Sequence, residues 1–205
     1  MMAILSLKNL LFSGDVLFGQ KHLPAAEAGF VSALSTFSKI TFWIATSIST
    51  VLFSYLVNPP ALTNDAQQSA LDKTKPAIQL KQLVKGSGLA IALSTASLLV
   101  LYVGGDWLIP LLLGAQYKPV SQLVGYLFLP MAFYSAFQLC VQSLMVKPRL
   151  LQVVKLGLLY LVQLLSMELW ADSIRSIYLI QMSIFLGGLF LFGAELIRWE
   201  REKSS

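Results

Sequence analysis

Two charged side chains stand inside apolar stretches of this sequence. Lys39 is the only charged residue between Glu27 and Asp65, and Asp15 interrupts the first apolar run of the chain. Placing a charge near the middle of a membrane costs roughly 2.5 kcal/mol of insertion free energy or more, so such a residue usually has a function. An ammonium group at Lys39 could face a wet cavity. A carboxylate at Asp15 could bind a coupling proton or cation.

Each of these charges also has a simpler interpretation. Lys39 could extend toward the membrane surface, or pair with Asp15 inside a helix bundle. Asp15 could lie near the outer interface, because a polar turn at residues 20–23 follows it closely. Lys39 stands about 15 residues or more from either end of its predicted helix, and its side-chain stem has only about four carbons. This position favours a cavity for the lysine and leaves both interpretations open for Asp15.

A stripe of hydroxyl-bearing and aromatic residues accompanies Lys39. On a helix that turns about 100° per residue, these side chains fall within about 60° of one direction. Such a face predicts a water-filled cavity or a polar partner, although Ser and Thr also bond their own backbone or a neighbouring helix. An aromatic ring here could stack on a ligand or simply pack. The residues assigned to the substrate cavity are Thr36, Lys39, Trp43, Thr46, Ser47 and Thr50.

The elements that position these residues are long apolar helices. The chain has 205 residues, of which 56% are hydrophobic and only 12% are charged, whereas a soluble domain has about 25% charged residues. We therefore predict an all-α fold, a polytopic membrane bundle of about six transmembrane helices. The predicted spans are 1–20, 24–58, 81–103, 120–146, 150–170 and 174–197, with an interfacial segment at 104–119, a loop at 59–80 and a tail at 198–205.

The distribution of basic residues predicts the orientation of the bundle. Ten Lys and Arg residues lie at the ends of the spans that would share one side, and three lie on the other. Because cytoplasmic segments carry the excess of Lys and Arg, both termini, the loop 59–80 and the tail 198–205 are predicted to be cytoplasmic. The ten are Lys73, Lys75, Lys81, Lys85, Lys147, Arg149, Lys155, Arg198, Arg201 and Lys203, and the three are Lys21, Lys118 and Arg175.

Several functional classes are disfavoured by what the sequence lacks. One cysteine, Cys140, cannot form an internal disulfide, and one histidine, His22, cannot build a multi-histidine metal site. We find no glycine-rich phosphate loop and no Ser/His/Asp arrangement, so neither an enzyme nor a catalytic residue, cofactor or metal is predicted. The basic residues do not form a run with interleaved aromatics, so nucleic acid is not predicted as a partner.

Short patterns along the chain resemble a known family of membrane transporters. The residues that carry the resemblance are Asp15 with Lys21, Leu23 with Glu27 and Gly29, Ala33 with Lys39 and 51–53, and the segment 111–119. They resemble the C-terminal half of polysaccharide flippases in the multidrug, oligosaccharidyl-lipid and polysaccharide (MATE-like) exporter superfamily. The family often has Pro and Arg after 51–53, where this chain has Ser54 and Tyr55, which predicts a straighter helix end.

The resemblance implies two bundles around a central cavity and transport by alternating access. This chain would supply one bundle, as a fragment, a split gene product or a half-sized protein, and would need an N-terminal bundle or a second copy. Its expected partners are a lipid-linked oligosaccharide and the lipids of a bacterial or archaeal cytoplasmic membrane. Two alternatives remain open: a cation-coupled multidrug exporter, and a non-transporting scaffold subunit of polysaccharide assembly.

Overall fold

The computed structural model describes residues 2–57, 65–144 and 150–204, and all of its elements are helices. This confirms the predicted all-α class for the described residues. Six helices are long, and three short ones connect α3 to α5. The elements are α1 (Met2–His22), α2 (Ala25–Val57), α3 (Asp65–Leu113), η1 (Ala115–Tyr117), α4 (Val120–Leu123), η2 (Val124–Leu127), α5 (Phe128–Leu144), α6 (Leu150–Trp170) and α7 (Ile174–Ser204).

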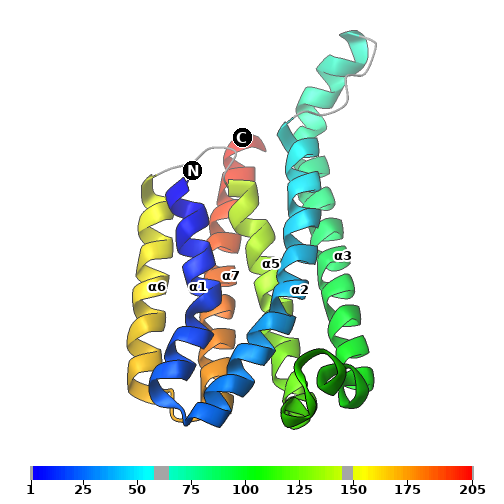
Figure 1. Cartoon of the computed structure of the whole chain (residues 1–205). Coiled ribbons are helices and arrows are strands. Elements are labelled where there is room, and N and C mark those ends of the chain that lie inside the picture. The colour runs from blue at the N-terminus through cyan, green and yellow to red at the C-terminus, as the bar shows by residue number, and fades with distance from the viewer. Residues whose placement is uncertain (1, 58–64, 145–149, 205) are drawn as a thin grey trace.

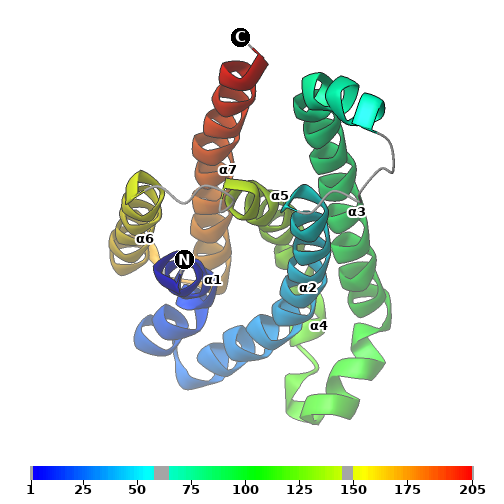
Figure 2. The same cartoon turned by 90° about the horizontal axis from the view of Figure 1, so that it is seen from above.

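The long helices form an up-and-down bundle in which each runs opposite to the one before it (Figure 1). Both ends of the chain lie at the same end of the bundle, and the α6–α7 connection lies at the opposite end (Figure 1). Viewed from above, α5 stands between α7 on one side and the α2–α3 pair on the other (Figure 2). Helix α1 packs against α2 and α6, so the first helix joins the two sides of the bundle.

Four helical stretches within the described residues are long and apolar enough to cross a membrane. They are Gly88–Leu113, Ala115–Val141, Leu150–Trp170 and Ile174–Arg198. This result supports a multi-pass membrane protein and four of the six predicted spans. The other two predicted spans, 1–20 and 24–58, form α1 and α2, whose crossing of the membrane stays a prediction.

Helix α3 differs most from the sequence-based expectation. It begins at Asp65, so residues 65–80 of the predicted loop are helical, and it continues to Leu113 through the segment expected to lie at the interface. Residues 65–80 are rich in Ala, Gln, Leu and Lys, which are strong helix formers. The helix ends at Gly114, whose φ of 101° is a backbone conformation that glycine adopts without steric cost. The predicted span 120–146 is divided into α4, η2 and α5.

The core is centred on α5, where aromatic residues from α1, α2 and α7 meet Tyr134. The Tyr134 ring centroid lies 4.8 Å from Phe12 of α1, 5.7 Å from Phe42 of α2 and 5.1 Å from Phe185 of α7. Tilted and offset rings at such distances contribute about 0.5–1.5 kcal/mol per pair beyond their buried area. The cluster fixes the spacing of the helices that carry the polar groups described below.

Adjacent glycines in α7 provide a test of this packing. A Cβ on Gly188 would lie 2.8 Å from the Phe137 ring, whereas a Cβ on Gly187 would meet nothing within 4 Å. We expect Gly188→Ala to lower the free energy of unfolding by about 1–3 kcal/mol, because Phe137 is buried and has little room to move. Gly187→Ala should be neutral or stabilise by up to about 1 kcal/mol through helix propensity. Equal thermal unfolding of the two variants in detergent would contradict the packing.

Candidate functional site

The carboxylate of Asp15 is enclosed between α1 and α2. Asp15 is only 1% exposed. Its Oδ1 atom accepts a hydrogen bond from the Val16 N–H at 2.9 Å and from the Ser35 hydroxyl at 3.4 Å. In a regular α-helix the Val16 N–H donates to the carbonyl of Phe12, four residues earlier. The Asp15 side chain therefore competes for a backbone donor of its own helix.

Two buried glutamines supply donors to the carbonyls of α1 next to this point. The Nε2 atom of Gln163 in α6 donates to the Leu11 carbonyl at 2.8 Å, and that of Gln181 in α7 donates to the Phe12 carbonyl at 3.0 Å. Both glutamines are fully buried. Sequence reasoning did not single them out, although an uncharged amide inside an apolar span is a signal because it needs a partner there.

Several oxygen atoms on these helices lack a partner. Among the described residues, the Oε1 atoms of Gln163 and Gln181 and the hydroxyl of Thr41 are buried without a hydrogen bond. The hydroxyl of Tyr178 in α7 interacts with the carboxylate of Asp15. Buried polar atoms are normally satisfied by protein, water or an ion. Asp15 and these oxygens could together hold water and a proton, or a small cation.

The charge of Lys39 lies on the exposed side of α2. Its ammonium interacts electrostatically with Asp15, but no ion pair joins the two within the part of the chain that the structure describes. The alternative in which Lys39 is neutralised by direct pairing with Asp15 is therefore not realised in this arrangement. Lys39 is instead free to meet a ligand or a partner at the surface of the bundle.

The remaining stripe residues divide between two environments. Thr36, Trp43, Ser47 and Thr50 are exposed, and Trp43 is 64% exposed. Thr46 is partly buried and accepts a hydrogen bond from Gln138 of α5 at 3.5 Å. The hydroxyls of Thr36 and Thr50 donate to carbonyls of their own helix at 3.0 and 2.8 Å, as the simpler interpretation of such hydroxyls allows.

A second cation lies inside the bundle. Lys8 of α1 is 3% exposed, and its Nζ atom stands 5.7 Å from the centroid of the Phe42 ring. It has no ion pair with any residue that the structure describes. Lys8 precedes Asp15 by two helical turns, about 10 Å, so the interior of the bundle holds one charge of each sign along α1. No local sequence pattern predicts that the side chain of Lys8 is buried.

Two Lys–Glu ion pairs outside this site connect α6 to its neighbours. Lys155 of α6 contacts Glu195 of α7 at 2.6 Å, and both side chains are largely buried. At the opposite end Lys21 of α1 contacts Glu168 of α6 at 2.5 Å, and both are about half exposed. An exposed pair contributes little to stability, because solvent screens its charges. These four residues connect neighbouring helices and are not assigned to the site.

The described residues contain no group of three or more His, Cys, Asp or Glu side chains that could hold a metal ion. Comparison of the chain with known protein families, curated proteins and solved structures found no match. We therefore infer function from the residues and from their placement in the bundle. Two features matter: an enclosed polar site at Asp15, and an exposed polar face on α2.

Proposed function

We propose that this chain is one bundle of a membrane transporter that flips a lipid-linked oligosaccharide across the cytoplasmic membrane, with both termini on the cytoplasmic side. The observation that carries the proposal is the exposed polar face of α2, with Lys39 at its centre. The common location of both chain ends is consistent with an even number of crossings (Figure 1).

The exposed face of α2 is polar, and this sets what can surround it. Hydrocarbon cannot solvate an ammonium group and a row of hydroxyls, so this face requires water or a polar partner. A second bundle opposite α2 would enclose a wet cavity, in which Lys39 neutralises phosphate and the hydroxyls bond to sugar. Rocking of the two bundles about that cavity would give alternating access.

Two alternatives explain parts of the same structure. A cation-coupled multidrug exporter is favoured by the enclosed carboxylate of Asp15 and the unpartnered oxygens on the neighbouring helices. A non-transporting scaffold would use the face of α2 only to bind another membrane protein. Lys39 distinguishes these functions, because a cavity for an anionic substrate needs a cation and a cavity for cationic drugs does not.

Reconstitution in lipid vesicles tests the proposal. We expect the monomeric chain to insert but not to transport, and the chain paired with an N-terminal bundle or a second copy to flip a fluorescent lipid-linked oligosaccharide. The readout is loss of fluorescence when an impermeant reductant reaches flipped substrate. Flipping by a demonstrated monomer would contradict the need for a second bundle. Drug export without oligosaccharide flipping would replace the proposed function by the first alternative.

A further inference from the structure

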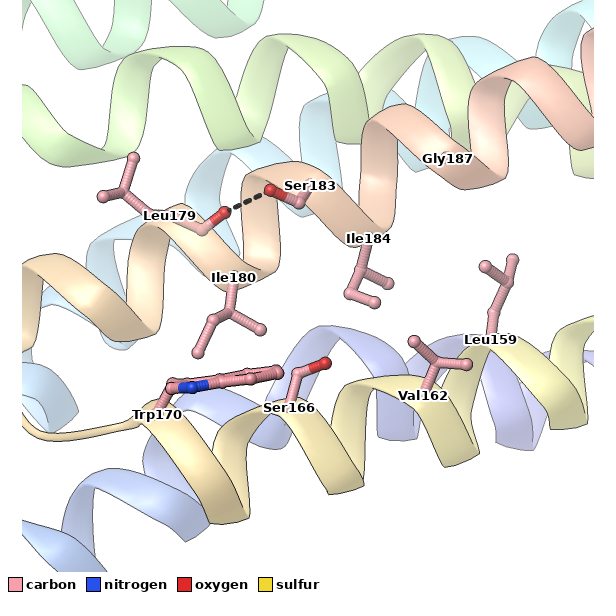
Figure 3. Close-up of a pocket in the computed structure, with 9 residues that line it drawn as sticks. All are labelled: Leu159, Val162, Ser166, Trp170, Leu179, Ile180, Ser183, Ile184 and Gly187. Atoms are coloured by element: carbon pink, nitrogen blue, oxygen red, sulfur yellow. Dashed lines mark hydrogen bonds between the residues drawn. The ribbon is translucent and has the colours of Figure 1, made fainter.

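An open groove separates α6 from α7 on the outer surface of the bundle (Figure 3). Its volume is about 470 Å³. Its walls are almost entirely apolar, and the hydroxyl of Ser183 is satisfied by its own helix, since it donates to the Leu179 carbonyl at 2.9 Å. The residues that line it include Leu159, Val162 and Trp170 of α6 and Ile180, Ile184 and Gly187 of α7.

The length of the groove matches one leaflet of a membrane. Along α6 the groove extends from Trp170 to Leu159, a distance of about 16 Å at 1.5 Å per residue. Half of a hydrocarbon core about 30 Å thick is about 15 Å. The groove therefore accommodates the acyl chain of a lipid from one leaflet. A polyprenyl chain would be too long for it.

The surface end of the groove has the features of a headgroup region. Figure 3 shows the Trp170 ring beside Ile180 at this end, and tryptophan is enriched where hydrocarbon meets water. Arg175, in the first turn of α7, is exposed and stands one turn before Leu179 of the groove. Arg175 has no ion pair with a described residue. Asp172 is also exposed here and would oppose a phosphate.

We propose that this groove is a binding site for a glycerophospholipid, with one acyl chain between α6 and α7 and the headgroup phosphate at Arg175. The lipid belongs to the leaflet at the α6–α7 connection, opposite the chain termini (Figure 1). This site is separate from the face of α2 and does not depend on the proposed transport function.

The test uses the full chain in detergent with Trp170 as its only tryptophan, after replacement of Trp43, Trp107 and Trp199 by Phe. A phospholipid with brominated acyl chains is titrated, and quenching of Trp170 fluorescence is measured. We expect saturable quenching. In Gly187→Phe, whose new side chain fills the groove, the saturable component should be lost. Gly193→Phe is the matched control, because a Cβ at either glycine meets nothing within 4 Å.

Headgroup variants test the phosphate contact. Arg175→Gln should raise the half-saturating lipid concentration about fivefold, as expected for one basic residue at a lipid headgroup, and Asp172→Asn should lower it. Val162→Phe fills the groove from α6 and replaces Gly187→Phe if that variant does not fold, as judged by its melting curve. Equal quenching in the filled and control variants would overturn the proposal. Stronger competition by a long polyprenyl phosphate than by unlabelled phospholipid would overturn it as well.

Discussion

Replacing Lys39 with methionine is expected to lower substrate flipping by about 10- to 100-fold while the protein still inserts and melts at the same temperature or higher. The expected loss corresponds to one hydrogen bond to a charged group, about 1.5–3 kcal/mol, between the ammonium and a substrate phosphate. Stability should hold because Lys39 has no ion pair with a described residue, and Asp15, with which it interacts only at longer range, keeps its hydrogen bonds from the Val16 N–H and the Ser35 hydroxyl. Methionine has a side chain of similar length, and burying it in an apolar environment carries no desolvation penalty.

The measurement is a vesicle flipping assay beside a melting curve, in an assembly that already transports. Lys39→Arg should retain part of the activity, because the charge remains while the shape of the donor group changes. Lys118→Met is the matched control, since Lys118 is an exposed lysine outside the stripe. Full activity of Lys39→Met would remove the cavity hypothesis and leave the stripe as a packing face.

Much of the helical framework follows from local sequence. The predicted spans 24–58 and 150–170 agree with α2 (Ala25–Val57) and α6 (Leu150–Trp170) to within one residue, because a proline or a polar turn borders each apolar run. The extension of α3 to Leu113 was missed. The helix ends where Gly114 adopts a positive φ. A glycine can adopt this conformation but need not, so the residue type alone does not predict the end of the helix.

The candidate site was predictable only in part. Lys39 and Asp15 stand out because each is a charge that interrupts an apolar run. This can be seen from the sequence of one helix. The roles of Gln163 and Gln181 depend on which faces α6 and α7 turn toward α1, and these contacts join residues about 150 or more positions apart. The burial of Lys8 likewise requires the position of Phe42 on a neighbouring helix. Long-range packing of this kind is not encoded in local periodicity.

Asp15→Asn is expected to abolish the dependence of transport on a proton or sodium gradient and to slow transport at least about tenfold. The amide oxygen of Asn can still accept hydrogen bonds from the Val16 N–H and the Ser35 hydroxyl, so the local structure should persist. The variant loses only the charge and the ability to release a proton. Because an enclosed carboxylate is costly in a membrane, its melting temperature should stay the same or rise.

A comparison of two replacements separates coupling from structure. Asp15→Leu removes the oxygen that accepts hydrogen bonds from the Val16 N–H and the Ser35 hydroxyl. The buried Ser35 hydroxyl then lacks this partner, so the free energy of unfolding should fall by about 1–3 kcal/mol. Asp106→Asn, at an exposed site outside both proposed sites, should leave gradient dependence unchanged. The experiment measures flipping in vesicles under imposed gradients, together with melting curves of the same preparations. If Asp15→Asn transports with the gradient dependence of the parent chain, Asp15 is a structural carboxylate, held by α1 and α2 without a part in coupling.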